Sequence, residues 1–332
     1  MIQHPAVIAL IVSSLTISCM ALYAAWCGLQ ILLKWDLNSG SELQLGLERR
    51  TYLISTILAY ALLFQILSLF LFIYTAEDIH TLFTGAMCAA GTLNADVYGY
   101  PTLLLKVFNC ILAGVWLIIN YADVRGYDYP LIKAKYTLLM VLAPLMVLEA
   151  LVQFGYFSGL RADVITSCCG SLFSADRPNV AGELAALPHS GIVPAFYGCI
   201  AATVLCGAVF ILKGRGGYLF SVMSGLSFVV CLAALISSFC LYFYELPTHH
   251  CPFCILQKEY GYAGYALYAS LLGGVVAGTG VGALMPFRGV ASLRGVIPGV
   301  QRRLTVAAVL LYLLFAAIVT YRMLTSSLVI FS

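Results

Sequence analysis

Residues 217–244 read GYLFSVMSGLSFVVCLAALISSFCLYFY, an apolar segment without an acidic, basic or histidine residue. A helix needs about 20 consecutive apolar residues to cross the hydrocarbon core of a membrane. The segment is longer than this, and it therefore predicts a transmembrane helix.

The rest of the chain has the same character. Of its 332 residues, 62% are hydrophobic and 9% are charged, and the mean hydropathy is +0.98. Soluble domains carry about 25% charged residues, so the composition indicates an integral membrane protein. Eight segments are long enough to span a membrane, at about residues 5–33, 51–75, 101–122, 136–158, 193–212, 217–244, 260–285 and 304–326.

We therefore expect an all-α fold, a polytopic membrane bundle of about eight transmembrane helices. It would consist of two four-helix halves, residues 1–158 and 193–332, joined by the loop 159–192. The seventh span contains Gly274, Gly278 and Gly282 at four-residue spacing. Such small residues let a neighbouring helix approach closely, and we interpret them as a packing face.

The basic residues predict the orientation of the bundle. Lysine and arginine are concentrated in alternate loops, at residues 34–50, 123–135, 213–216 and 286–303. Basic loops remain cytoplasmic, which places both termini and the loops 76–100, 159–192 and 245–259 outside. We expect a bacterial inner-membrane protein whose cysteine-rich loops face the periplasm. The formal net charge of +3 gives no indication of nucleic-acid binding.

This orientation brings the loop cysteines and all five histidines to the outer side. Thiols in the oxidising periplasm tend toward disulfide or metal chemistry. The other cysteines lie inside apolar runs, where cysteine is a small packing residue. The loop cysteines are Cys88, Cys168, Cys169, Cys251 and Cys254.

Residues 249–258 read HHCPFCILQK and contain a C-x-x-C motif. We expect this motif at the N-terminus of the seventh span, where free N–H groups lower a thiol pKa and favour the reactive thiolate. Pro252 suits a first helical turn.

Two other interpretations of the motif stay open. Cys251 and Cys254 could form a static disulfide or remain as two thiols. Alternatively, His249, His250, Cys251 and Cys254, with Cys88, could bind a metal, although adjacent histidines point apart and rarely bind one ion together. We expect the two histidines mainly to tune the charge beside Cys251.

CPFCILQK resembles the C-x-x-C-x-x-Q-R signature of disulfide bond formation protein B, a membrane enzyme that passes electrons from protein thiols to quinone. It resembles the vitamin K epoxide reductase group more loosely. The resemblance implies that Cys254 faces a quinone and that Cys251 is its disulfide partner. Gln257 and Lys258 match the glutamine and arginine of the signature. The resemblance covers about ten residues, and the family core has four spans rather than eight.

The segment ITSCCGSLFS places Cys168 beside Cys169. A disulfide between neighbours is strained and easily reduced. The pair could be a labile redox switch, a relay to Cys251 or a soft-metal chelate. We expect a bridge or exchange reaction between this loop and Cys251 or Cys88.

Glu149 lies within the fourth predicted span, and Lys106 in the third lies at a depth roughly one or two helical turns from it. Ionisable residues inside a membrane are costly and require partners. The two residues could form an ion pair that joins two helices, or the polar end of a quinone pocket. Further polar residues could extend this network, namely Gln65, Asn109, Asn120 and Gln153.

The sequence thus favours a membrane thiol-disulfide oxidoreductase that uses a quinone and a periplasmic thioredoxin-like or other dithiol protein. No nucleotide-binding or haem-attachment motif is present, and we expect neither haem nor nucleotide. One alternative is a transporter or binding protein for a soft metal of the copper, zinc or mercury type. The other is a non-catalytic membrane subunit with structural disulfides. The oligomeric state is not predicted.

Overall fold

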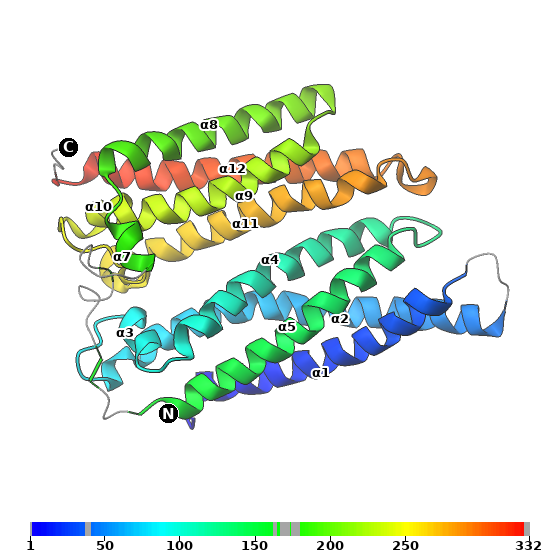
Figure 1. Ribbon diagram of the computed structural model, residues 1–332, viewed down its shortest axis with the longest axis horizontal. Helices are drawn as coiled ribbons and strands as arrows, with labels where there is room; N and C mark the ends of the chain where they lie inside the picture. The colour runs from blue at the N-terminus through cyan, green and yellow to red at the C-terminus, as the bar shows by residue number, and fades with distance from the viewer. Residues whose placement is uncertain (1, 37–40, 162–164, 167–172, 174–179, 329–332) are drawn as a thin grey trace. The chain divides into compact units, whose positions relative to one another are not determined.

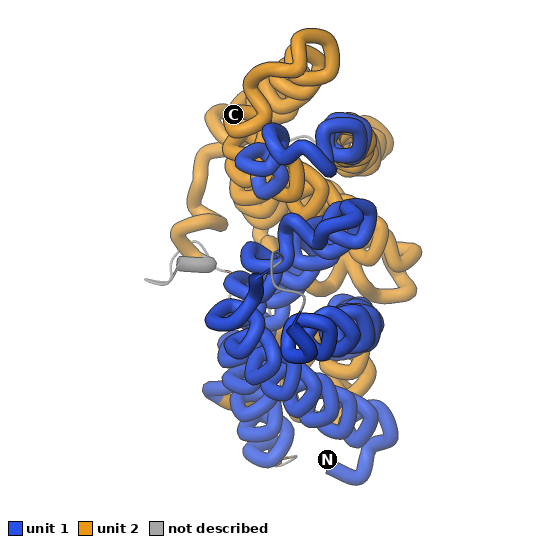
Figure 2. Tube along the Cα trace, turned by 90° about the vertical axis from the view of Figure 1, so that its right-hand side faces the viewer, with its two compact units in different colours: residues 1–72, 97–160, 283–301 blue, residues 73–96, 161–282, 302–332 orange. Residues whose placement is uncertain are grey.

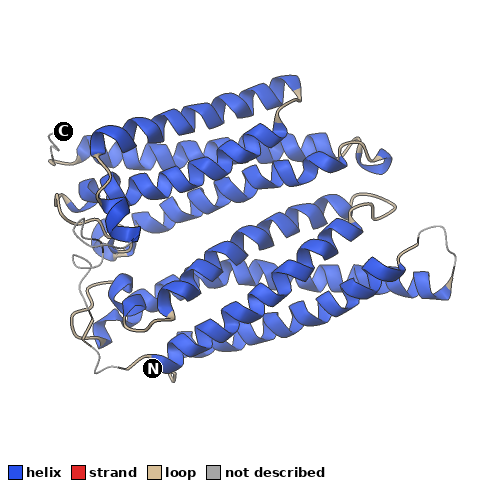
Figure 3. Cartoon of the chain, in the orientation of Figure 1, coloured by secondary structure: helices blue, strands red, loops and turns tan. Residues whose placement is uncertain are grey.

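The computed structural model describes residues 2–36, 41–161, 165–166, 173 and 180–328. The regular secondary structure of these residues is entirely helical, and Figure 3 shows no strand among them. This part of the chain has eight helices that are long and apolar enough to cross a membrane. The prediction of an all-α, multi-pass membrane protein is therefore confirmed.

The long helices occupy all the predicted spans (Figure 1). The sixth span continues from α9 through the π-helical turn η2 (Leu235–Phe239) into α10 (Cys240–Tyr244). The helices are α1 (Pro5–Lys34), α2 (Glu42–Asp78), α4 (Gly99–Asp123), α5 (Ile132–Gly159), α8 (His189–Lys213), α9 (Gly217–Ala234), α11 (Ala263–Leu284) and α12 (Ile297–Thr325).

Two helices extend well beyond the segments that hydropathy predicts. The second span was expected at 51–75, but α2 already begins at Glu42, and α12 begins at Ile297 rather than at 304. Hydropathy identifies only the part of a helix that lies in hydrocarbon, whereas its hydrogen bonds can continue into polar surroundings. Arg302 and Arg303 are therefore helical and not part of a loop.

The chain divides into two compact units, coloured separately in Figure 2. Unit 1 comprises residues 1–72, 97–160 and 283–301, and unit 2 comprises residues 73–96, 161–282 and 302–332. These units differ from the continuous halves expected at 1–158 and 193–332, because residues 73–96 group with the second unit. The loop that carries Cys88 thus belongs to the same unit as the C-x-x-C motif.

In unit 1, α5 packs against both α1 and α4. The fully buried Trp116 fixes the α4–α5 contact, since its indole N–H donates to the carbonyl oxygen of Lys135 at 3.0 Å. Lys135 itself is buried and pairs with Asp123 at 2.7 Å. The sequence counted Lys135 among the basic loop residues, but its charge is neutralised within the protein. The basic character of that loop therefore depends on Arg125 and Lys133.

In unit 2, glycines of α11 allow close contact with α9. A Cβ atom on Gly278 would lie 2.0 Å from Ser224 Oγ, and one on Gly282 would lie 2.4 Å from Ser221 Oγ. The hydroxyl of Tyr312 on α12 donates to the Ser224 carbonyl oxygen at 2.6 Å. These contacts confirm the predicted packing face.

Candidate functional site

The C-x-x-C motif lies in a folded loop between α10 and α11. Cys254–Leu256 and Lys258–Tyr260 form two short 3-10 turns, and α11 begins only at Ala263. Gly261 and Tyr262 have φ angles of 63° and 56°, a left-handed conformation that separates these turns from α11. The expectation that Cys251 and Cys254 occupy the first turn of the seventh span is therefore wrong.

Three cysteines meet in this loop region. The sulfurs of Cys88, Cys251 and Cys254 all lie within 4.8 Å of one another. Cys88 Sγ is 3.6 Å from Cys251 Sγ, which is longer than the roughly 2.05 Å of a formed disulfide. Cys88 and Cys251 are 0% exposed and Cys254 is 5% exposed. The three side chains thus form a buried sulfur cluster, which we call the cysteine cluster.

The two histidines point in different directions. His249 Nε2 lies 3.4 Å from Cys254 Sγ, and its ring packs edge-on against Tyr244 with centroids 4.5 Å apart. His250 Nδ1 instead donates to the carbonyl oxygen of Ile236 at 3.0 Å. Because Ile236 lies in the π-helical turn η2, His250 hydrogen-bonds a carbonyl oxygen at an irregular part of the helix. The structure therefore places His249 beside Cys254, whereas we expected both histidines beside Cys251.

Tyrosine side chains hold the loop in place through its backbone. The hydroxyl of Tyr244 donates to the carbonyl oxygen of Cys251, and the hydroxyl of Tyr268 donates to that of Pro252. Tyr260 packs on Tyr244 with ring centroids 4.9 Å apart. Burial raises the pKa of Tyr260, and the nearby Cys254 raises it further, so this phenol stays protonated at neutral pH. Backbone anchors therefore fix the position of Cys251, and its sulfur also accepts from the Phe253 N–H at 3.5 Å.

Glu77, near the end of α2, connects the Cys88 segment to the C-x-x-C loop. One carboxylate oxygen accepts from Gln257 Nε2 at 2.7 Å, and the other accepts from the backbone N–H of Ala89 at 2.7 Å. Gln257 also donates to the carbonyl oxygen of Met87 at 2.8 Å. These bonds hold the residues on both sides of Cys88, which itself precedes the short helix α3 (Ala89–Asn94).

Sequence reasoning missed Glu77. The available signal was its position, an acidic residue just after the second predicted span and in the same connection as Cys88. Gln257, which we expected near a quinone, donates its amide N–H groups to Glu77 and to the Met87 carbonyl oxygen.

A surface hollow of about 500 Å³ lies next to this network. Gln257 and Lys258 both line it, as do Glu77, His80 and Tyr265. Leu256, two residues after Cys254, lies on the same wall, whereas the cysteines themselves are not among the lining residues. The hollow thus brings amide, ammonium, imidazole and phenol groups next to the loop that holds Cys254.

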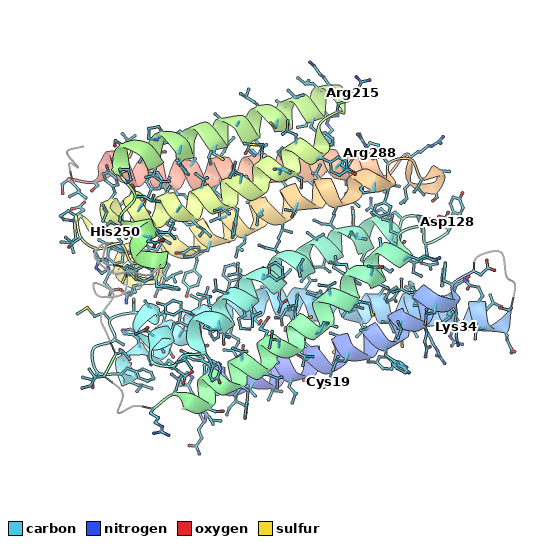
Figure 4. All side chains as sticks on the ribbon, viewed as in Figure 1. Cys19, Lys34, Asp128, Arg215, His250 and Arg288 are labelled. Carbon is cyan, nitrogen blue, oxygen red and sulfur yellow. The ribbon has the colours of Figure 1, made fainter. Side chains whose placement is uncertain are left out.

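Cys168 and Cys169 lie outside the described residues. Described residues on either side of them contact both cysteine-bearing segments: the Thr166 N–H donates to the Thr84 carbonyl oxygen at 3.0 Å, and the rings of Phe173 and Phe253 are 6.4 Å apart. In Figure 4, His250 lies at one end of unit 2 and Arg215 at the other. Within unit 2, the cysteine-bearing loops thus lie at the opposite end from the basic Arg215.

Lys106 and Glu149 belong to unit 1 and form a separate polar cluster. Lys106 Nζ is 2.8 Å from a Glu149 carboxylate oxygen, and the two side chains are 0% and 1% exposed. The carboxylate also accepts from Gln65 at 2.6 Å and from Asn109 at 2.6 Å. The expected ion pair is confirmed, with Gln65 and Asn109 as members. Asn120 and Gln153 bond elsewhere, to Lys135 and to α1.

The cysteines expected to pack inside the helices differ in burial. Cys27, Cys110, Cys231 and Cys240 are buried, Cys199 and Cys206 are partly buried, and Cys19 is exposed.

A comparison with protein families, curated proteins and solved structures finds no match for this chain.

Proposed function

We propose that the protein is a membrane thiol-disulfide oxidoreductase whose reaction centre is the cysteine cluster. The observation that carries the proposal is the convergence of three sulfurs within 4.8 Å from two segments that lie 163 residues apart. Packing alone does not require three cysteines at one point, whereas disulfide exchange requires a thiolate close to a disulfide.

The central step is an internal exchange. In the oxidised centre, Cys251 and Cys254 share a disulfide and Cys88 carries the thiolate. The Cys88 thiolate attacks Cys251 Sγ, the bond between Cys251 and Cys254 breaks, and Cys254 leaves as a thiolate. The 3.6 Å between the Cys88 and Cys251 sulfurs is close to the separation of about 3–3.5 Å from which bonds form.

A quinone is the proposed electron acceptor, and the hollow beside Gln257 and Lys258 is its proposed site. A reduced pair of cluster cysteines would give two electrons and two protons to the quinone, which becomes quinol as the disulfide forms again. The Lys258 ammonium would stabilise the negative charge that develops on a quinone oxygen. His249 Nε2, at 3.4 Å, could take the proton of the Cys254 thiol.

The proposed electron donor is a dithiol protein in the periplasm. This requires the cysteine-bearing loops to face the periplasmic side of a bacterial inner membrane. The exposed basic residues at the opposite end of unit 2, Lys213 and Arg215, favour this orientation. Cys168 and Cys169 would receive the electrons and pass them to the cluster by thiol-disulfide exchange. The contacts of Thr166 and Phe173 with Thr84 and Phe253 support this role.

The test uses right-side-out membrane vesicles and a reduced thioredoxin-like protein that cannot cross the membrane. We expect Cys251→Ser or Cys254→Ser to abolish both oxidation of this protein and quinone reduction. Cys206→Ser, on α8, is the matched control and should retain activity. The proposal fails if either cluster variant keeps the wild-type rates.

A further inference from the structure

We infer that the reduced cysteine cluster, together with His249, is a binding site for one zinc ion. Metal binding by reduced thiols is a property separate from the electron transfer proposed above, and it does not depend on a quinone or a dithiol partner. Three cysteines and one histidine are one of the usual ligand sets of tetrahedral zinc.

The distances in the cluster suit such an ion. Zinc binds sulfur at about 2.3 Å and nitrogen at about 2.0–2.1 Å, so a tetrahedral site places two sulfurs about 3.8 Å apart and a sulfur and a nitrogen about 3.5 Å apart. The Cys88 and Cys251 sulfurs are 3.6 Å apart, and His249 Nε2 is 3.4 Å from Cys254 Sγ. Cys254 Sγ lies within 4.8 Å of the other two sulfurs.

His249 is the ligand that has to move. The 4.8 Å limit is shared by the three sulfurs and does not include the imidazole. His249 Nε2 is in contact with Cys254, so closing the site requires the ring to move toward Cys88 and Cys251. The ring is only partly buried, and it lies in the loop before the motif, where such a movement leaves the long helices in place.

The surroundings of the cluster are those of a closed metal site. The bond from Tyr244 to the Cys251 carbonyl oxygen holds one ligand through its backbone, and the bond from the Ala89 N–H to Glu77 holds the residue that follows Cys88. Outer contacts of this kind orient metal ligands, and their loss typically lowers metal affinity about 10–100-fold. Four protein ligands complete the tetrahedral coordination of zinc, and Cys88 and Cys251 are fully buried, which favours a structural or regulatory zinc over a catalytic one.

Zinc and a disulfide are alternative states of the same sulfurs. A disulfide between Cys251 and Cys254 removes two of the four ligands, so zinc should bind only to the reduced protein. Bound zinc would in turn keep Cys88 from acting as a nucleophile, because its thiolate electron pair would be held by the metal.

The test uses the full-length protein in detergent, reduced and then equilibrated with zinc alone. We expect about one zinc per chain by elemental analysis, and X-ray absorption at the zinc edge should give three sulfur ligands and one nitrogen ligand. Prior oxidation with diamide should abolish binding. Cys88→Ser and His249→Ala should each weaken zinc binding at least tenfold, since even outer contacts have effects of that size.

Cys206→Ser and His250→Ala are the matched controls, and both should bind zinc as the wild type does. A reduced protein that binds no zinc overturns the inference. It is also overturned by zinc bound mainly through oxygen and nitrogen, or by undiminished binding after oxidation. The absorption measurement needs only wild-type protein, so a variant that fails to fold does not prevent the decision. None of these measurements involves quinone or dithiol turnover, and each proposal can therefore fail without the other.

Discussion

Removal of the Glu77 carboxylate should separate Cys88 from Cys251. Glu77 accepts one bond from Gln257 and one from the Ala89 N–H, each at 2.7 Å, and it links the two cysteine-bearing segments together with the direct bond from Gln257 to the Met87 carbonyl oxygen. A hydrogen bond to a charged group contributes about 1.5–3 kcal/mol. Because the Glu77 side chain is 14% exposed, we take the lower value for each bond, and Glu77→Ala then weakens the anchoring of Cys88 by about 3 kcal/mol.

This free energy corresponds to a large change in the fraction of molecules in which the Cys88 and Cys251 sulfurs lie side by side. Every 1.4 kcal/mol changes an equilibrium about tenfold, so Glu77→Ala should lower the local population of the paired arrangement by up to about 100-fold. Glu77→Gln retains one carbonyl oxygen as an acceptor, and its effect should be intermediate. Asp78→Asn is the matched control, since Asp78 is the adjacent acid on the same hollow.

The assay follows disulfide formation between Cys88 and Cys251 under mild oxidant, in a background with Cys254, Cys168 and Cys169 changed to serine. Peptide mass spectrometry gives the rate at which the bridged peptide forms. We expect Glu77→Ala to slow this rate at least tenfold, and Asp78→Asn to leave it within about twofold of the background protein. A Glu77→Ala rate equal to that of the background would refute the role of Glu77 as the anchor.

Two predictions concern the stability of the units. Lys106→Met should destabilise the protein by about 3–5 kcal/mol because it leaves the Glu149 charge buried and unpaired, and Lys106→Met combined with Glu149→Leu should recover most of this loss. Denaturant unfolding in detergent measures both, and a double variant no more stable than the single one would contradict the ion-pair argument. Gly278→Leu should reduce the yield of folded protein, because any Cβ atom there would clash with Ser224. Gly225→Leu is the control, since a Cβ atom at Gly225 has no neighbour within 4 Å. Equal yields of the two variants would count against close packing of α9 and α11.

The features that sequence predicts correctly are those with a local energetic signature. A helix that crosses a membrane satisfies its backbone N–H and C=O groups internally and needs only apolar side chains, so a long apolar run is sufficient to identify one. Likewise, Glu149 inside a span requires a partner, and Lys106 is the cation predicted within roughly one or two helical turns of its depth. The packing face of α11 is also predictable from the sequence, because Gly274 and Gly278 recur at four-residue spacing.

The arrangement of the candidate site has no such signature. Cys88 and Cys251 are 163 residues apart, and no periodicity relates one loop to another. The start of α11 also depends on the left-handed Gly261 and Tyr262, and a tyrosine rarely adopts this conformation. Sequence therefore placed Cys254 on a helix that begins nine residues later, at Ala263.

Burial of the cluster imposes an order on the proposed electron transfer. A protein dithiol requires an accessible sulfur, but Cys88 and Cys251 are 0% exposed and Cys254 is 5% exposed. Exchange with a protein partner should therefore take place at another pair, and Cys168 and Cys169 are the remaining cysteines of the loops. The quinone meets a different barrier, since the hollow lined by Lys258 is separated from the sulfurs by the turn Cys254–Leu256. Both transfers thus require the C-x-x-C loop to open, and the Tyr244, Tyr268 and Glu77 bonds are the contacts that such an opening must break.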